Sequence, residues 1–138
     1  MTAAETLLAE AVAAVNAGDY KTAANRFERA GELLSAKSGK KLGKGRARDA
    51  AAAYESAARC YLMLNDHNHA IAAVELARRL QPASPRVARV HAEVADRVGY
   101  APTRRQAWQD VLTAGRRSDR MFAQLQLASI ARELGEHA

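Results

Sequence analysis

Residues 54–82 read YESAARCYLMLNDHNHAIAAVELARRLQP, and this stretch decides the fold. Tyr54, Ala58 and Tyr61 recur at the spacing of one face of a helix. A second face of the same spacing follows the Asn-Asp pair at 65–66 and ends at a proline: Ala70, Val74, Ala77 and Pro82. Small residues let two helices approach closely, and larger neighbours fill the space beside the contact. The stretch therefore predicts a helical hairpin with Ala58 and Ala70 buried at its contact.

The pattern recurs on both sides of this hairpin. Forty-seven residues upstream, Ala23, Phe27 and Ala30 repeat the spacing of Ala70, Val74 and Ala77. Downstream, a weaker copy is formed by Ala107, Val111 and Ala114. An apolar stripe without a partner helix then follows, with Met121, Phe122, Leu125 and Leu134 along it. The sequence therefore predicts three hairpins and one final helix.

This order of residues resembles the tetratricopeptide repeat, whose signature of about 34 residues is W-x2-L-G-x2-Y, then A-x3-F, then P. Tyr54, Ala57 and Ala58 stand for its Trp, Leu and Gly; Tyr61, Ala70 and Pro82 match it, and Val74 replaces Phe. The resemblance implies one all-α domain, a right-handed α-α superhelix of about three such hairpins with a C-terminal capping helix. The hairpins would span 1–35, 49–83 and, in degenerate form, 84–117, and the capping helix 118–138.

Capping residues predict where the helices begin. Ser, Thr and Asp accept hydrogen bonds from the free amides of the first turn, and proline is favoured at the first helical position. The predicted capping residues are Thr2, Asp19, Ser84 before Pro85, Thr103 and Ser118. Gly99 is predicted to end the fifth helix.

A basic Gly/Lys segment at 36–48 separates the first two hairpins. Its six basic residues equal the net charge of the whole chain, +6: Lys37, Lys40, Lys41, Lys44, Arg46 and Arg48. So polar and glycine-rich a segment cannot bury surface, and we expect a loop. Residues 38–45 resemble a phosphate-binding loop only loosely, because the glycine spacing is one residue short and Gly45 replaces the Ser or Thr that binds magnesium.

The remaining candidates for chemistry favour structural roles. His67 and His69 lie beside Asp66 without an evident fourth metal ligand, so we expect turn packing. His91 is predicted to be a hydrogen-bonded histidine of the core or groove. Cys60 falls on the buried stripe without a basic neighbour, which favours an inert thiol. No catalytic constellation stands out, so we expect no enzymatic activity, metal or cofactor.

The resemblance implies a non-enzymatic adaptor or co-chaperone-like scaffold that binds a peptide or partner helix in a concave groove. The first helix of each hairpin would line that groove. Periodicity assigns ten positions to it: Leu8, Val12, Asn16, Glu55, Arg59, Met63, Arg86, Arg89, Glu93 and Arg97. These residues grade from apolar to arginine-rich, which favours an acidic amphipathic partner. The alternative is that the last four only form exposed pairs at helical spacing.

Some repeats of this family clamp the C-terminal carboxylate of a heat-shock chaperone with Lys and Asn side chains. Here the corresponding faces carry Leu8, Val12 and Ser56, which disfavours that ligand. A second hypothesis is a basic helical protein that associates with RNA or DNA through its arginines. Its weakness is an aromatic content of 5%, with Phe27, Tyr54 and Trp108 on core stripes. A third hypothesis is an oligomer-forming structural subunit.

Location is predicted from three features. No apolar run reaches the roughly 18 residues of a membrane span. Residues 1–5 lack the basic and apolar regions of a signal peptide. The only cysteine is Cys60, so no disulfide can form within the chain. We expect a cytoplasmic protein without a membrane partner.

Overall fold

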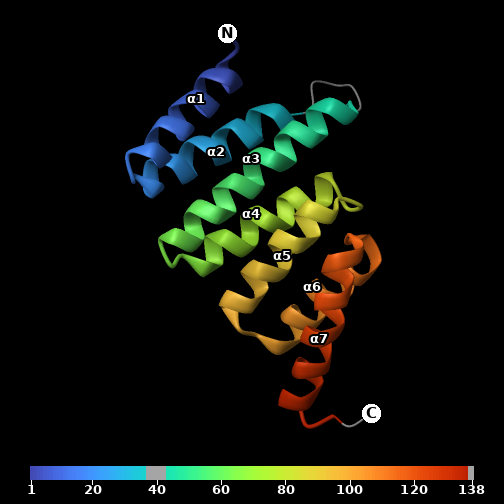
Figure 1. Cartoon of the computed structure of the whole chain (residues 1–138). Coiled ribbons are helices and arrows are strands. Elements are labelled where there is room, and N and C mark those ends of the chain that lie inside the picture. Colours follow the sequence, from blue (N-terminus) through green and yellow to red (C-terminus); the bar gives the residue numbers. More distant parts are fainter. Residues whose placement is uncertain (37–42, 137–138) are drawn as a thin grey trace.

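The computed structural model describes residues 1–36 and 43–136, and every regular element within them is a helix (Figure 1). The helices are α1 (Ala3–Asn16), α2 (Tyr20–Ser35), α3 (Lys44–Met63), α4 (His67–Leu80), α5 (Pro85–Val98), α6 (Ala101–Ala114) and α7 (Arg117–Glu133). α1 packs on α2, α3 on α4 and α5 on α6, and α7 packs on α6. The predicted all-α architecture of three hairpins and a final helix is confirmed.

Alanines close the contacts between the helices of the first half. Ala58 of α3 and Ala70 of α4 are both 0% exposed, as predicted. They belong to a hydrophobic cluster that also contains Ala11, Ala23 and Val94, from α1, α2 and α5. The helices approach closely because no side chain larger than a methyl group separates them at these points.

The contact between α2 and α3 depends on a glycine that the sequence pattern did not single out. A Cβ atom on Gly31 would lie 3.0 Å from ring atoms of Tyr54, which is closer than side chains normally pack. Tyr54 is itself buried. The ring of Tyr54 therefore occupies the space where a side chain at position 31 would otherwise lie.

A second hydrophobic cluster is built around Trp108 of α6. Trp108 is 0% exposed and packs with Ala92 of α5 and with Ala123 and Ile130 of α7. Its indole N–H donates to Asp96 Oδ1 at 3.0 Å. The third hairpin lacks a large aromatic residue in its first helix, and Trp108 in its second helix fills that space.

Helix capping follows the prediction for α1, α2 and α5 and departs from it for α6 and α7. Thr2, Asp19 and Ser84 each accept a hydrogen bond from a first-turn amide of α1, α2 and α5. Gly99 ends α5 in the left-handed region at φ 84°. The predictions for Thr103 and Ser118 are wrong. α6 begins at Ala101 because Pro102 already fits its first turn, and α7 begins at Arg117, so both hydroxyl residues lie inside a helix.

The expectation of a loop that runs through Arg48 is also wrong for residues 44–48. α3 begins at Lys44, so Lys44, Arg46 and Arg48 are helical. The Arg46 guanidinium donates to the carbonyls of Leu33 at 2.9 Å and Leu34 at 2.7 Å. These carbonyls at the end of α2 have no partner within their own helix, and the arginine satisfies them. Lys37, Lys40 and Lys41 lie outside the described residues.

Within residues 1–36 and 43–136, no helix is both long enough and apolar enough to cross a membrane.

Candidate functional site

The surface between α1 and α3 is hollowed, and most of the residues that line it are apolar. Two hollows of about 390 and 260 Å³ lie between α1 and α3, and both are lined by Phe27 of α2 and Ser56 of α3. The larger is also lined by Ala4, Leu8, Leu34, Ala52 and Ala53, together with the polar residues Thr2, Glu5 and Asp49. The smaller is also lined by Val15, Tyr20, Arg59, Cys60 and Met63. The two hollows share Phe27 and Ser56, and together they are called the apolar trough below.

The predicted groove positions of the first half are only partly in this trough. Leu8 and Met63 line the hollows, and Met63 is exposed. Val12 and Asn16 are exposed on α1 but line neither hollow. Phe27 was missed as a lining residue, because it belongs to α2, the second helix of its hairpin. Periodicity within one helix carries no signal for such a contribution.

Charged residues form a network where α3 meets α5. Glu55 was predicted to line the groove, but its side chain is only 3% exposed. Its carboxylate accepts from Arg86 Nε at 2.8 Å and lies 3.5 Å from Arg59 Nε. Glu93 in turn accepts from Arg89 at 3.2 Å and lies 3.9 Å from Arg59. Five of the predicted residues are therefore joined in one network, with Glu55 beneath the arginines.

The network continues onto α6 and α7 through Arg89. The Arg89 guanidinium lies over the rings of Trp108 at 5.1 Å and Phe122 at 4.7 Å, and 3.9 Å from Asp119. A cation above an aromatic face is attracted by the ring electrons. Asp119 and Phe122 were not predicted here, because their position depends on how α7 packs against the degenerate third hairpin.

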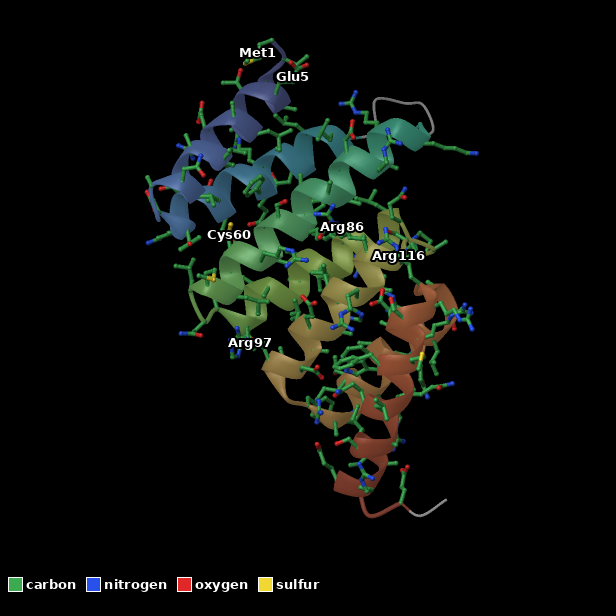
Figure 2. All side chains as sticks on the ribbon, in the orientation of Figure 1. Met1, Glu5, Cys60, Arg86, Arg97 and Arg116 are labelled. Carbon is green, nitrogen blue, oxygen red and sulfur yellow. The ribbon has the colours of Figure 1, made fainter. Side chains whose placement is uncertain are left out.

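The arginines of the network keep free donors at the surface. Arg59 and Arg86 are more than half exposed in their side chains. Arg97 is exposed and has no ion-pair partner within the described part of the chain. Figure 2 shows Arg86 near the start and Arg97 near the end of α5. The acids of the network offset most of its positive charge. It therefore offers guanidinium hydrogen-bond donors of fixed direction to a partner, rather than a strongly positive electrostatic potential.

The turn between α3 and α4 holds the two histidines considered as metal ligands. Asp66 caps α4 and contacts His69 Nδ1 at 2.7 Å. This hydrogen bond lowers the pKa of Asp66 and raises the pKa of His69. The His69 ring stacks on Tyr61, whose hydroxyl donates to Glu28. Among the described residues, no three His, Cys, Asp or Glu side chains are placed to hold a metal ion together.

Cys60 lines the apolar trough but is nearly buried, at 5% exposed. Burial raises the pKa of its thiol, because the charged thiolate would lose its hydration. The thiol is therefore protonated near neutral pH and is a poor nucleophile.

His91 differs from expectation. It is buried in α5 at 3% exposed, but its Nδ1 atom has no hydrogen-bond partner among the described residues. Burial lowers the pKa of His91, and the nearby positive charge of Arg78 lowers it further, while Asp110 and Glu75 oppose the shift. The histidine is therefore held neutral in the folded protein.

We expect this neutral histidine to make the fold sensitive to acid. Because its pKa is lower in the folded state, the unfolded chain binds more protons as the pH falls below about 6.5. Its stabilising contribution is complete above that pH and is lost progressively below it, by about 1.4 kcal/mol for each unit of lowered pKa. Urea unfolding at neutral and mildly acidic pH should show a smaller loss of stability for His91→Leu than for the parent. Equal losses in the two proteins would contradict this assignment.

No protein-family model and no curated protein matches the sequence. Among solved structures, the chain is similar to the first TPR of Spaghetti (RPAP3) bound to HSP90 peptide SRMEEVD. The TM-score is 0.67, and the match covers 96% of each chain at 14% sequence identity. At this identity the likeness concerns the fold, and it agrees with the repeat pattern and with the seven helices. The chain therefore has the fold of a tetratricopeptide-repeat domain.

Proposed function

We propose that this chain is a non-enzymatic protein-interaction module, an adaptor or co-chaperone-like scaffold, that binds a peptide or partner helix in its groove. The observation that supports this most is the continuity of two surfaces. The apolar trough between α1 and α3 leads into the arginine network between α3 and α5 through Arg59, which belongs to both. A single partner segment could therefore contact apolar and charged surfaces in succession.

The trough fits apolar side chains of such a partner. Its smaller hollow, of about 260 Å³, has aliphatic, aromatic and sulfur-containing walls from Val15, Phe27, Cys60 and Met63. Burial of a partner's leucine or phenylalanine there would remove apolar surface from water on both sides, which favours binding. We infer that one or two apolar anchors of the partner occupy the trough.

The arginines fit carboxylates that follow those anchors. A guanidinium can bind a carboxylate through two parallel hydrogen bonds, which fixes direction as well as charge. Glu55 and Glu93 already hold Arg59, Arg86 and Arg89 in place, so less side-chain entropy is lost when a partner binds. An amphipathic segment with apolar anchors and adjacent acidic residues is therefore the proposed ligand.

The peptide bound to the RPAP3 domain serves as a discriminating probe. The family's carboxylate clamp uses Lys and Asn side chains, whereas Leu8, Val12 and Ser56 occupy the corresponding faces here. We therefore expect SRMEEVD to bind this chain more weakly than a segment with an internal apolar anchor.

The cytoplasmic location stays a prediction.

The proposal is tested by selection from a random peptide display library, followed by fluorescence anisotropy with the enriched peptides. The expected consensus has a large apolar residue followed by Asp or Glu. Binding should fall at least about tenfold, or 1.4 kcal/mol, for Met63→Glu in the trough and for Arg97→Glu beyond the network. Arg29→Glu, at an exposed position of α2, is the matched control that should leave binding unchanged. Circular dichroism checks the fold of each variant.

Two outcomes would oppose the proposal. Enriched peptides that bind all three variants as tightly as the parent would place the binding surface elsewhere. Tight, salt-dependent binding of generic oligonucleotides without any peptide consensus would favour the nucleic-acid hypothesis. Light scattering during size-exclusion chromatography separately tests the hypothesis of an oligomer-forming subunit.

A further inference from the structure

α7 carries an apolar surface that no described residue covers. Met121 and Leu125 are 66% and 68% exposed, which is unusual for large apolar residues. Phe122 and Ala128 are also exposed. These four residues, Met121, Phe122, Leu125 and Ala128, are called the α7 apolar surface below. Figure 1 shows α7 alongside α6 at the end of the array, with no further helix beside it.

This surface is separate from the side of α7 that packs into the protein. Ala123, Leu127 and Ile130 join the Trp108 cluster. Leu125 lies two residues from both Ala123 and Leu127, and two residues along a helix correspond to about 200° of rotation. Residues 121, 125 and 128 follow a spacing of four and three, so they form one continuous stripe along the helix. Such a stripe fits the apolar face of another helix.

The charges around the stripe are positive and free. Arg116, Arg117 and Arg120 are exposed, and none has an ion-pair partner in the part of the chain that the structure describes. The acids of the same region are already engaged, because Asp119, Glu133 and Glu136 contact Arg89, Arg104 and Arg105. The arginines also lie in and before the first turn of α7, where the helix dipole disfavours positive charge. Their placement thus has an electrostatic cost that an acidic partner would remove.

We propose that the α7 apolar surface and its three arginines dock an acidic amphipathic helix of another protein, at a site distinct from the groove. Apolar residues of that helix would pack on Met121, Leu125 and Ala128. Acidic residues at its edge would pair with Arg117 and Arg120.

Other occupants fit this surface less well. A second copy of the chain fits less well. In a parallel pair Arg117 and Arg120 would face their own copies. In an antiparallel pair Arg117 would approach Arg132 and also Glu133, but Glu133 is already paired with Arg104.

The arginines could also contact phosphates of a nucleic acid, but a single strand is normally held by stacking on free aromatic faces as well. Phe122 is the aromatic residue of the α7 apolar surface, and its ring already contacts Trp108 and the Arg89 guanidinium.

The test uses a synthetic helical peptide of Leu, Ala and Glu, with Leu at alternating spacings of three and four and Glu along both edges. A peptide of the same composition, with its leucines spread around the helix, is the control. In anisotropy titrations the patterned peptide should bind the parent protein. Its affinity should fall at least tenfold for Leu125→Asp and for the double variant Arg117→Glu with Arg120→Glu. Because the groove is itself proposed to take acidic amphipathic segments, the same titrations are repeated in the Met63→Glu background, where groove binding is weakened and binding to the α7 apolar surface should remain.

Several results would overturn the proposal. Equal binding of the patterned and control peptides would mean that the apolar stripe is not recognised. Failure of the patterned peptide to bind at millimolar concentration would exclude an acidic helix as the partner. Equal binding by Leu125→Asp and the parent would place the contact elsewhere. Complete loss of binding in Met63→Glu, with Leu125→Asp binding as the parent does, would assign the peptide to the groove alone. Concentration-dependent dimers that Leu125→Asp abolishes would identify a second copy as the occupant, and binding to anionic vesicles or oligonucleotides with the same sensitivity would identify a different class of partner.

Discussion

Trp108→Ala should lower the free energy of unfolding by about 3–5 kcal/mol, the range for removal of a large aromatic side chain from a core. Trp108 is completely buried and contacts residues of α5, α6 and α7. Its removal would leave a cavity between all three helices and would also remove the ring above which Arg89 lies. Urea unfolding monitored by circular dichroism measures the loss.

Trp108→Phe is the matched control. It keeps an aromatic ring and loses the hydrogen bond to Asp96, which Arg104 and water can still satisfy. We expect a smaller cost, about 1–2 kcal/mol, from the lost volume and the lost hydrogen bond. Hydrogen exchange should show the protection lost mainly in α5 to α7, since repeat units contact chiefly their neighbours. An alanine variant within 1 kcal/mol of the parent would mean that Trp108 does not hold this end together.

The double variant Arg59→Met with Arg86→Met should cost about 3–5 kcal/mol, because it leaves a buried carboxylate without its counter-charges. Glu55 is 3% exposed in its side chain, whereas both arginines reach solvent. Methionine keeps most of the aliphatic packing of arginine and removes only the charged end. The free energy of unfolding in urea is again the measurement.

The control uses the difference in exposure between the buried Glu55 carboxylate and the two arginines that reach solvent. Glu55→Met, with both arginines kept, should cost less than the double variant, because the exposed guanidinium groups can return to water. Each single arginine variant should cost less than half of the double one, since the other arginine still pairs with Glu55. If Glu55→Met is as damaging as the double arginine variant, packing of the Glu55 chain rather than its charge stabilises the junction.

Local patterns in the sequence were sufficient for the hairpins but not for all of their ends. The alanine spacing placed Ala58 and Ala70 correctly, since a buried face must recur with the period of the helix. The start of α3 was missed because a glycine- and lysine-rich segment shows no apolar periodicity. Arg46 supports it through two carbonyls of α2, a contact that forms only when the first two hairpins pack together.

The charged residues of α3 and α5 were predictable as neighbours, but their burial was not. Periodicity placed Arg59, Arg86, Arg89 and Glu93 on one surface. Arg59 and Arg89 both pair with Glu93, and Arg86 joins them through Glu55. It also counted Glu55 as exposed, because it could not foresee that Arg86 would cover it from the next hairpin. Asp119 and Phe122 join the network from α7. Their place depends on the packing of α6 around Trp108, which departs from the repeat pattern.

α5 is the helix that both larger hydrophobic clusters share. Val90 and Val94 pack with residues of α1 to α4, while Ala88, Ala92 and Ala95 pack with residues of α6 and α7. Within the described residues, no hydrophobic cluster contains both α1 and α7. A pulling force on the two ends of the chain would therefore be transmitted through the packing contacts of α5. We therefore expect the two halves to rotate slightly about α5, and the array to separate under load at one of the two faces of α5.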